Sequence, residues 1–219
     1  MPQSIAELVD RLDLVLPGAG PIAPSAVSQA RERLGSEPMR WLFAKTAETW
    51  GHASARRHPW RGLALYGVDG TTVRVPDSKA NRTHFGGQRG GHGECGYPLA
   101  RVLTLTALRS HLPCAARFGP YTLSEQLYAL ELWSMVPGNT LCIVDRHFFA
   151  ADILIPLARD GSNRHWLLRA KTNTVWRTVE RLGRGEELVG PSSRRSARRQ
   201  LSGFDTLSAL GTHRPILWL

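Results

Sequence analysis

The chain has 219 residues, of which 42% are hydrophobic and 21% are charged, and these shares exclude a chain that is disordered throughout. Its net charge of +10 favours a polyanionic partner such as nucleic acid, and the alternative is a basic surface that contacts only solvent. The three cysteines lack paired spacing, which excludes a disulfide scaffold, and the acidic first segment excludes a secretory signal. No apolar stretch is long enough to span a membrane. We therefore expect a cytoplasmic protein.

The first sixty residues carry three helical patterns. Apolar residues recur at helical spacing over 4–16, where a serine and a glutamate three residues later form a capping box. Two further helices are predicted, one over 25–35, which ends at a glycine, and one from 37 toward 50, where a proline occupies the first turn. The basic stretch 56–59 is typical of a linker. We therefore expect residues 1–60 to form a helical N-terminal segment.

Short apolar runs typical of strands begin at residue 63. Residues 63–68 and 71–75 predict two strands, and Asp69-Gly70 between them predicts a hairpin, because Asp-Gly favours tight turns. Residues 79–96 are polar and contain two glycine pairs, which predicts a long flexible loop. A third strand is predicted over 100–108.

The second half of the chain alternates helices and strands. A helix is predicted after Thr122, which serves as its N-cap, and Pro137-Gly138 ends it. A strand over 141–145, a helix over 150–159 and a strand over 166–170 follow. The apolar face expected for the first of these helices consists of Leu123, Leu127, Leu130 and Trp133.

This order of elements predicts how the strands pair. The first three strands can form an antiparallel meander, after which the helix crosses over and brings the strand that ends at Asp145 parallel to the strand that ends at Asp69. Both aspartates would then lie at one edge of a mixed sheet, which is a ribonuclease-H-like α/β arrangement. Two adjacent carboxylates can hold a divalent metal for phosphoryl chemistry on nucleic acid. The alternative is that Asp69 only sits in a turn and Asp145 only ends a strand.

An ordered series of motifs carries a family resemblance across residues 24–190. Residues 66–77 read Tyr-Gly-Val-Asp-Gly-Thr-Thr-Val-Arg-Val-Pro-Asp, and this run resembles the first catalytic segment of insertion-sequence DDE transposases of the family-four type. Asp-Gly-Thr alone is a weak signal, but the ordered series is specific. The other segments that fit the family are 25–35, 42–43, Asn81, 85–86, 97–101, 144–148 and 167–171.

The resemblance implies a reaction and the residues that would carry it. Asp69 and Asp145 would be the first two acids of the triad that binds two Mg²⁺ ions, for which Mn²⁺ can substitute, and the reaction would be DNA cleavage and strand transfer. The partner would be double-stranded DNA, both as transposon ends and as target. The chain would associate with the nucleoid and with a second copy as a dimer. The basic residues expected at the DNA backbone are Arg74, Arg82, Arg89, Arg146, Arg169 and Lys171.

The sequence departs from the family at the third acid. That acid lies in a Tyr-x-x-Arg-x-x-x-Glu pattern on a later helix, and the chain has no tyrosine after Tyr128. We therefore expect a form truncated at both ends, with an incomplete C-terminal part. It would consist of a partial DNA-binding region over 1–60, a partial catalytic core over 61–171, and the start of an inserted β region with a divergent basic tail over 172–219. The missing helix would leave apolar surface of the sheet exposed.

The sequence leaves three interpretations of activity. The first is a DDE transposase that is inactive because two carboxylates alone hold divalent ions weakly. The second is a non-enzymatic DNA-binding remnant that holds the phosphate backbone through arginine-rich segments. In the third, two chains, or this chain and a downstream fragment, complete the triad together.

Overall fold

The computed structural model describes residues 24–90, 93–94, 96–159, 162–169, 176–183 and 186–191. Contacts divide the chain into two units, Met1–Thr46 and Ala47–Leu219. The helix predicted over 4–16 lies outside the described residues.

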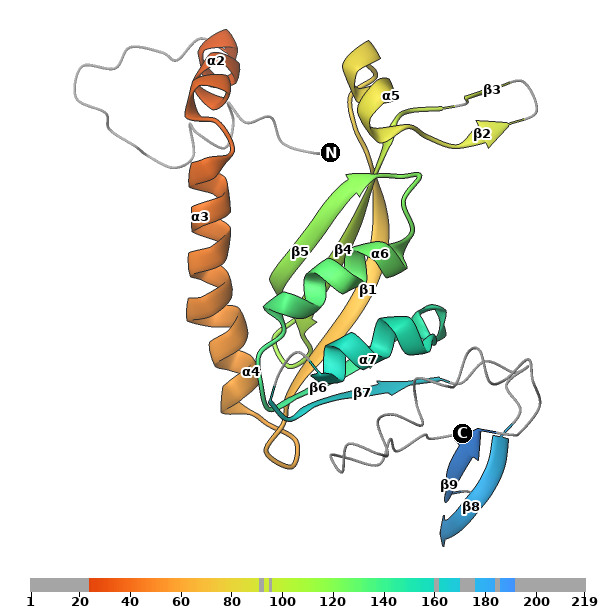
Figure 1. The fold of residues 1–219 in the computed structure, drawn as a ribbon. Coiled ribbons are helices and arrows are strands. Elements are labelled where there is room, and N and C mark those ends of the chain that lie inside the picture. The colour runs from red at the N-terminus through yellow and green to blue at the C-terminus, as the bar shows by residue number, and fades with distance from the viewer. Residues whose placement is uncertain are drawn as a thin grey trace. The chain divides into compact units, whose positions relative to one another are not determined.

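In its described residues the N-terminal unit contains two helices, which confirm their predictions. Helix α2 spans Pro24–Leu34 and α3 spans Glu37–Thr46 (Figure 1). Gly35 ends α2 with a φ of 69°, a left-handed conformation that suits glycine, and its N–H donates to the Arg31 carbonyl at 3.2 Å. None of the α3 residues is buried, so the apolar side chains of this helix do not form a core.

The second unit begins with a helical segment that runs further than predicted. A π-helical stretch, η1 (Ala47–His52), leads into α4 (Ala53–Arg57), so the linker expected over 56–59 begins only after a helix. The reason is tertiary packing. Ala55 is fully buried, and the Ser54 Oγ lies 2.6 Å from the Oγ of Ser110.

A five-stranded mixed sheet forms the centre of this unit, in the order β5-β4-β1-β6-β7 (Figure 1). Strand β1 (Ala64–Arg74) pairs antiparallel with β4 (Leu99–Ala107), which pairs antiparallel with β5 (Leu112–Pro120). Strands β6 (Thr140–Val144) and β7 (Arg164–Leu168) both run parallel to β1. The predicted parallel pairing of the two aspartate-bearing strands is therefore confirmed.

The predicted hairpin at Asp69-Gly70 is wrong, because β1 continues through both residues as one strand of 11 residues. Strand β4 pairs with it from Tyr66 to Arg74, with Asp69 opposite Thr104 and Gly70 opposite Leu103. This long ladder outweighs the local preference of Asp-Gly for a turn. The third strand of the antiparallel meander is β5, which the sequence did not predict.

The predicted flexible loop over 79–96 is also wrong in part. Residues Lys79–Phe85 form helix α5, and beyond it the short strands β2 (Arg89–Gly90) and β3 (Gly93–Glu94) pair antiparallel. The cap of α5 is Ser78, whose Oγ accepts a backbone N–H of the first turn at 3.2 Å. A capping residue therefore begins a helix where glycine pairs suggested only a loop.

Helices α6 (Glu125–Leu132) and α7 (Ala151–Arg159) cover one face of the sheet: α6 contacts β4 and β5, and α7 contacts β7. The N-cap of α6 is Ser124 instead of Thr122, because the Ser124 Oγ accepts the Leu127 N–H at 3.4 Å. The short 3₁₀ turn η2 (Trp133–Met135) follows α6.

The buried side of α6 differs from the predicted one. Leu123, Leu127 and Leu130 are exposed, whereas Trp133 is buried as predicted. Hydrophobic residues lie all around this helix, so their spacing alone does not identify the side that packs. The residues that α6 buries are Tyr128, Ala129 and Leu132.

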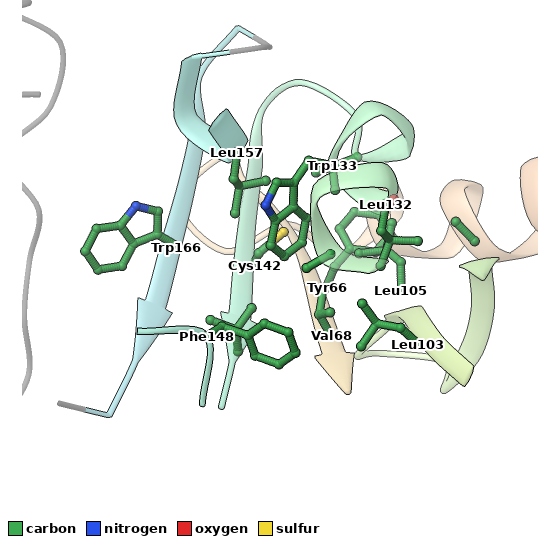
Figure 2. Packing of buried hydrophobic residues seen from close by; sticks show 14 of the residues in the cluster. Tyr66, Val68, Leu103, Leu105, Leu132, Trp133, Cys142, Phe148, Leu157 and Trp166 are labelled. Atoms are coloured by element: carbon green, nitrogen blue, oxygen red, sulfur yellow. The ribbon is translucent and has the colours of Figure 1, made fainter. Parts of the chain in front are cut away.

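A hydrophobic core lies between the sheet and these helices (Figure 2). At its centre the Trp133 indole N–H donates to the Ile153 carbonyl at 2.8 Å, which ties η2 to α7. The other large side chains of this core come from strands and helices alike. They include Tyr66, Val68, Leu103, Leu105, Leu132, Cys142, Phe148, Leu157 and Trp166.

The last described elements form a separate hairpin. Strands β8 (Trp176–Gly183) and β9 (Glu186–Pro191) pair antiparallel. None of the described helices is long and apolar enough to cross a membrane.

Candidate active site

Asp69 and Asp145 lie at the same edge of the sheet. The parallel register of β1 and β6 ends with Val68 opposite Val144, and each aspartate is the next residue along its chain. Both aspartates are exposed. The structure therefore places side by side the ends of the two strands whose carboxylates the sequence predicted as a pair.

The two carboxylates also share a face of the sheet. Side chains alternate along a strand, and Tyr66 and Val68 point into the core on the helix side, so Asp69 points to the opposite side. In β6, Val144 is buried and Ile143 is exposed, and the backbone of Asp145 is still extended, with a φ of −68° and a ψ of 155°. Asp145 therefore faces the same way as Asp69, away from α6 and α7.

Each carboxylate is oriented by a backbone N–H. The Asp145 Oδ1 accepts the His147 N–H at 2.8 Å and thereby caps η3 (Arg146–Phe148). The Asp69 Oδ1 accepts the Gly70 N–H at 2.9 Å. Within the described residues neither carboxylate forms an ion pair, so both keep oxygen lone pairs for a cation.

This pair of donors fits a divalent metal ion. Mg²⁺ prefers oxygen ligands and is usually held by one or two carboxylates, with water and substrate phosphate completing its coordination. Asp69 and Asp145 supply such a pair at an exposed edge. Across the described part of the chain, no group of three or more His, Cys, Asp or Glu side chains is placed to hold a metal, so no third acid joins them here.

Two of the predicted DNA-contacting arginines reach this edge. Arg146 directly follows Asp145 and is exposed in η3. The register of β6 and β7 ends with Val144 opposite Leu168, so the exposed Arg169 follows at the next position along the edge. Positive charge therefore flanks the carboxylates where a phosphate backbone would approach.

The other four predicted contacts lie elsewhere or outside the description. Arg74 ends β1, and its guanidinium carbon lies 5.9 Å from the centroid of the exposed Tyr97 ring. Arg82 in α5 donates two hydrogen bonds to Asp77, at 2.6 and 2.7 Å, which neutralises much of its charge. The Arg89 side chain and all of Lys171 lie outside the described residues.

Sequence reasoning missed a charged pair beside Asp69. Arg101 of β4 donates to Glu125 at 2.8 Å, and the Glu125 carboxylate lies against Gly70, the residue after Asp69. In the sequence, Glu125 stands three residues after the predicted N-cap Thr122, a spacing typical of a capping box, and nothing local links it to Arg101. The pair joins residues that are 24 positions apart, so a local pattern could not have found it.

The buried thiols near the site are not candidate nucleophiles. Burial raises the pKa of the Cys142 thiol to about 12, and burial also raises the pKa of Cys114. Both thiols therefore stay protonated at neutral pH, and a protonated thiol is a poor nucleophile and metal ligand. Both are packing residues of the core: Cys142 belongs to β6, and Cys114 of β5 lies against Gly51 of η1.

Comparison with known families identifies the family of this chain. Residues 1–44 match the family described as insertion element 4 transposase N-terminal, and residues 60–214 match the transposase DDE domain. The chain belongs to the IS4 family of DDE transposases. The DDE domain implies a ribonuclease-H-like fold, which confirms the predicted fold class, and transposases with this domain use divalent metal ions.

Two relatives from Escherichia coli K12 support the assignment. The chain is 36% identical to the transposase InsG for insertion sequence element IS4 over 203 residues, which are 92% of this chain and 46% of InsG. It is also 36% identical to the putative transposase InsZ over 182 residues, which are 81% of this chain and 61% of InsZ. The chain therefore spans about half the length of these curated relatives. No solved structure matches it.

Proposed function

We propose that this chain contributes the Asp69–Asp145 half of a transposase active site and acts in DNA transposition by metal-dependent DNA cleavage and strand transfer. The observation that supports the proposal is the register of β1 and β6, which ends one residue before both aspartates within a DDE domain. Two carboxylates on one sheet face, each with a lone pair to spare, form a donor set for Mg²⁺, with Mn²⁺ as a substitute.

The residues of the edge have distinct parts in this proposal. Asp69 and Asp145 hold the metal, and the backbone N–H groups of Gly70 and His147 keep their carboxylates in place. A divalent ion bound there stabilises the charge that develops on the attacking and leaving oxygens of a phosphodiester. Arg146 and Arg169 attract the phosphate backbone to the same edge.

The proposed partner is double-stranded DNA, as transposon ends and as target. The net charge of +10 supports it, because basic side chains release counterions from DNA when they bind phosphate. Four further contacts, Arg74, Arg82, Arg89 and Lys171, belong to the same proposal. Self-association as a dimer and a location on the nucleoid follow from the same proposed role.

A DNA-binding remnant without chemistry is the second candidate. It is favoured by one observation, the absence of a third acid beside Asp69 and Asp145 among the described residues. Two carboxylates alone bind a divalent ion weakly, because affinity rises with the number of charged ligands. We therefore expect low activity from the isolated chain even where the first proposal holds.

Nicking of a supercoiled plasmid that carries the element's ends separates the two candidates. The wild-type chain is compared with D69N and D145N in Mg²⁺ and in Mn²⁺, and with D152N as a control, because Asp152 is an exposed aspartate on α7, which packs on the helix side of the sheet. Nicking that D69N and D145N lose and D152N keeps is the expected result. Retardation of the DNA on a gel without nicking would favour the binding remnant. The absence of both nicking and retardation would exclude both candidate functions.

A further inference from the structure

Glu125 occupies the space that a side chain at position 70 would need. An ideal Cβ built on Gly70 would lie 2.5 Å from the Glu125 carboxyl carbon, and 2.7 and 2.8 Å from its two oxygens. Atoms do not approach so closely without displacement, so this carboxylate and a larger residue at 70 exclude each other. Gly70 lies in a regular strand pair opposite Leu103, so the requirement is for space and not for an unusual backbone conformation.

Arg101 fixes the Glu125 side chain in that space. Its Nη1 donates to Glu125 Oε1 at 2.8 Å, while Nε and Nη2 donate to the Tyr121 carbonyl at 3.4 and 3.2 Å. The guanidinium carbon also lies 4.9 Å from the centroid of the Tyr121 ring. The two side chains of the ion pair are only 19% and 22% exposed, so water competes with the pair less than it does on an open surface.

The backbone of β1 lacks a second strand neighbour at this position. Pairing with β6 ends at Val68, and beyond it β4 is the one described strand that pairs with β1. Asp69 is therefore the first residue of β1 without β6 beside it. At Gly70, the Glu125 carboxylate packs against the strand from the helix side and supports the backbone there.

We infer that Glu125 and Arg101 are positioning residues, which hold the Asp69-Gly70 backbone so that the Asp69 carboxylate meets Asp145 at a shared metal ion. This rests on the proposed metal site. Glu125 is not itself a ligand, since Gly70 shares the helix-facing side of β1 with Val68 and Asp69 faces the other way. Arg101 also neutralises the Glu125 charge, so this carboxylate adds little repulsion to a site that already holds two.

The test measures Mn²⁺ affinity and thermal stability of the full 219-residue chain. E125A removes the support, E125Q keeps its shape and its hydrogen bond from Arg101, and G70A displaces the carboxylate from its place. The matched control is E131A, because Glu131 lies on the same helix and pairs with Arg117 of β5 at 3.4 Å, away from Asp69. Free Mn²⁺ is read by electron paramagnetic resonance, and melting temperatures are taken without metal.

We expect E125A to raise the Kd for Mn²⁺ about 10-fold, as is typical for residues that orient metal ligands, with E125Q within about threefold of wild type. G70A should behave like E125A. E131A should leave the Kd unchanged, and its melting temperature should fall less than that of E125A, because its ion pair is longer and more exposed. Affinities are compared at a temperature where every variant is folded, so a higher Kd in E125A and G70A, but not in E131A, distinguishes positioning from a general effect on folding.

Three outcomes would overturn the inference. Equal Kd values for E125A and E131A would refute it and leave the metal site intact. A Kd for E125Q as high as that of E125A would assign the effect to the carboxylate charge and not to support of the strand. Mn²⁺ binding that is absent, or that D69N leaves unchanged, would refute the metal site and this inference together.

Discussion

Replacing Trp133 by Phe is predicted to lower the free energy of unfolding by about 2 kcal/mol. Trp133 is fully buried, and its indole N–H donates to the Ile153 carbonyl at 2.8 Å. Loss of one such hydrogen bond costs about 1 kcal/mol. The smaller ring buries roughly 40 Å² less apolar surface, which at about 25 cal/mol per Å² is worth about 1 kcal/mol more. The change tests the packing that holds α7 against the sheet beneath the Asp145 strand.

Urea denaturation followed by circular dichroism measures this loss. With a slope of about 2 kcal/mol per molar urea, the midpoint for W133F should fall by about 1 M. W41F is the control, because Trp41 is 62% exposed on α3 and should shift the midpoint by less than about 0.25 M. Equal shifts for the two variants, or no shift for W133F, would refute the assignment of Trp133 to the core.

Three further predictions concern pH, packing and salt. Burial lowers the pKa of His52 from its ordinary value of 6.5, so below pH 6.5 the unfolded chain binds a proton that the folded chain does not. The melting temperature of wild type should therefore fall more than that of H52Q between about pH 7.5 and about pH 5.5. Equal falls in the two proteins would contradict this. A Cβ on Gly51 would lie 2.6 Å from the Cys114 Sγ, so G51A should lower the free energy of unfolding by about 1–3 kcal/mol in urea denaturation. Adding C114A to the same chain should restore part of this loss. A G51A variant as stable as wild type would show that the core has room at this position. R146Q and R169Q should each reduce the slope of log affinity for DNA against log salt by about 1 in filter binding, and an unchanged slope would remove that residue from the DNA contact surface.

The sheet edge could be predicted from the sequence because it depends on rules of topology. A helix between two apolar runs requires a crossover, and a crossover places the second strand parallel in the same sheet. That reasoning placed Asp145 beside Asp69 although the hairpin assumed at Asp69-Gly70 does not exist. The error did not propagate, because β5 supplies the third strand that the hairpin was thought to provide.

The missed elements have specific physical reasons. Strand β5 carries Pro113 and Pro120, which argue against a central strand, but β5 is an edge strand and tolerates them. The buried side of α6 was ambiguous because leucines lie all around it. The contact between Glu125 and Gly70 joins residues far apart in the chain, and only the folded sheet brings them together. Long-range packing of this kind leaves no periodic signal in a single sequence.

The central claim is that Asp69 and Asp145 hold one metal ion between them, and a double-mutant cycle of Mn²⁺ binding tests it directly. Affinity is measured for wild type, D69N, D145N and the double variant. If the two carboxylates share an ion, each single substitution should remove most of the binding, and the double variant should lose little more. Losses that simply add, or an affinity that either substitution leaves unchanged, would show that these aspartates do not form a common metal site.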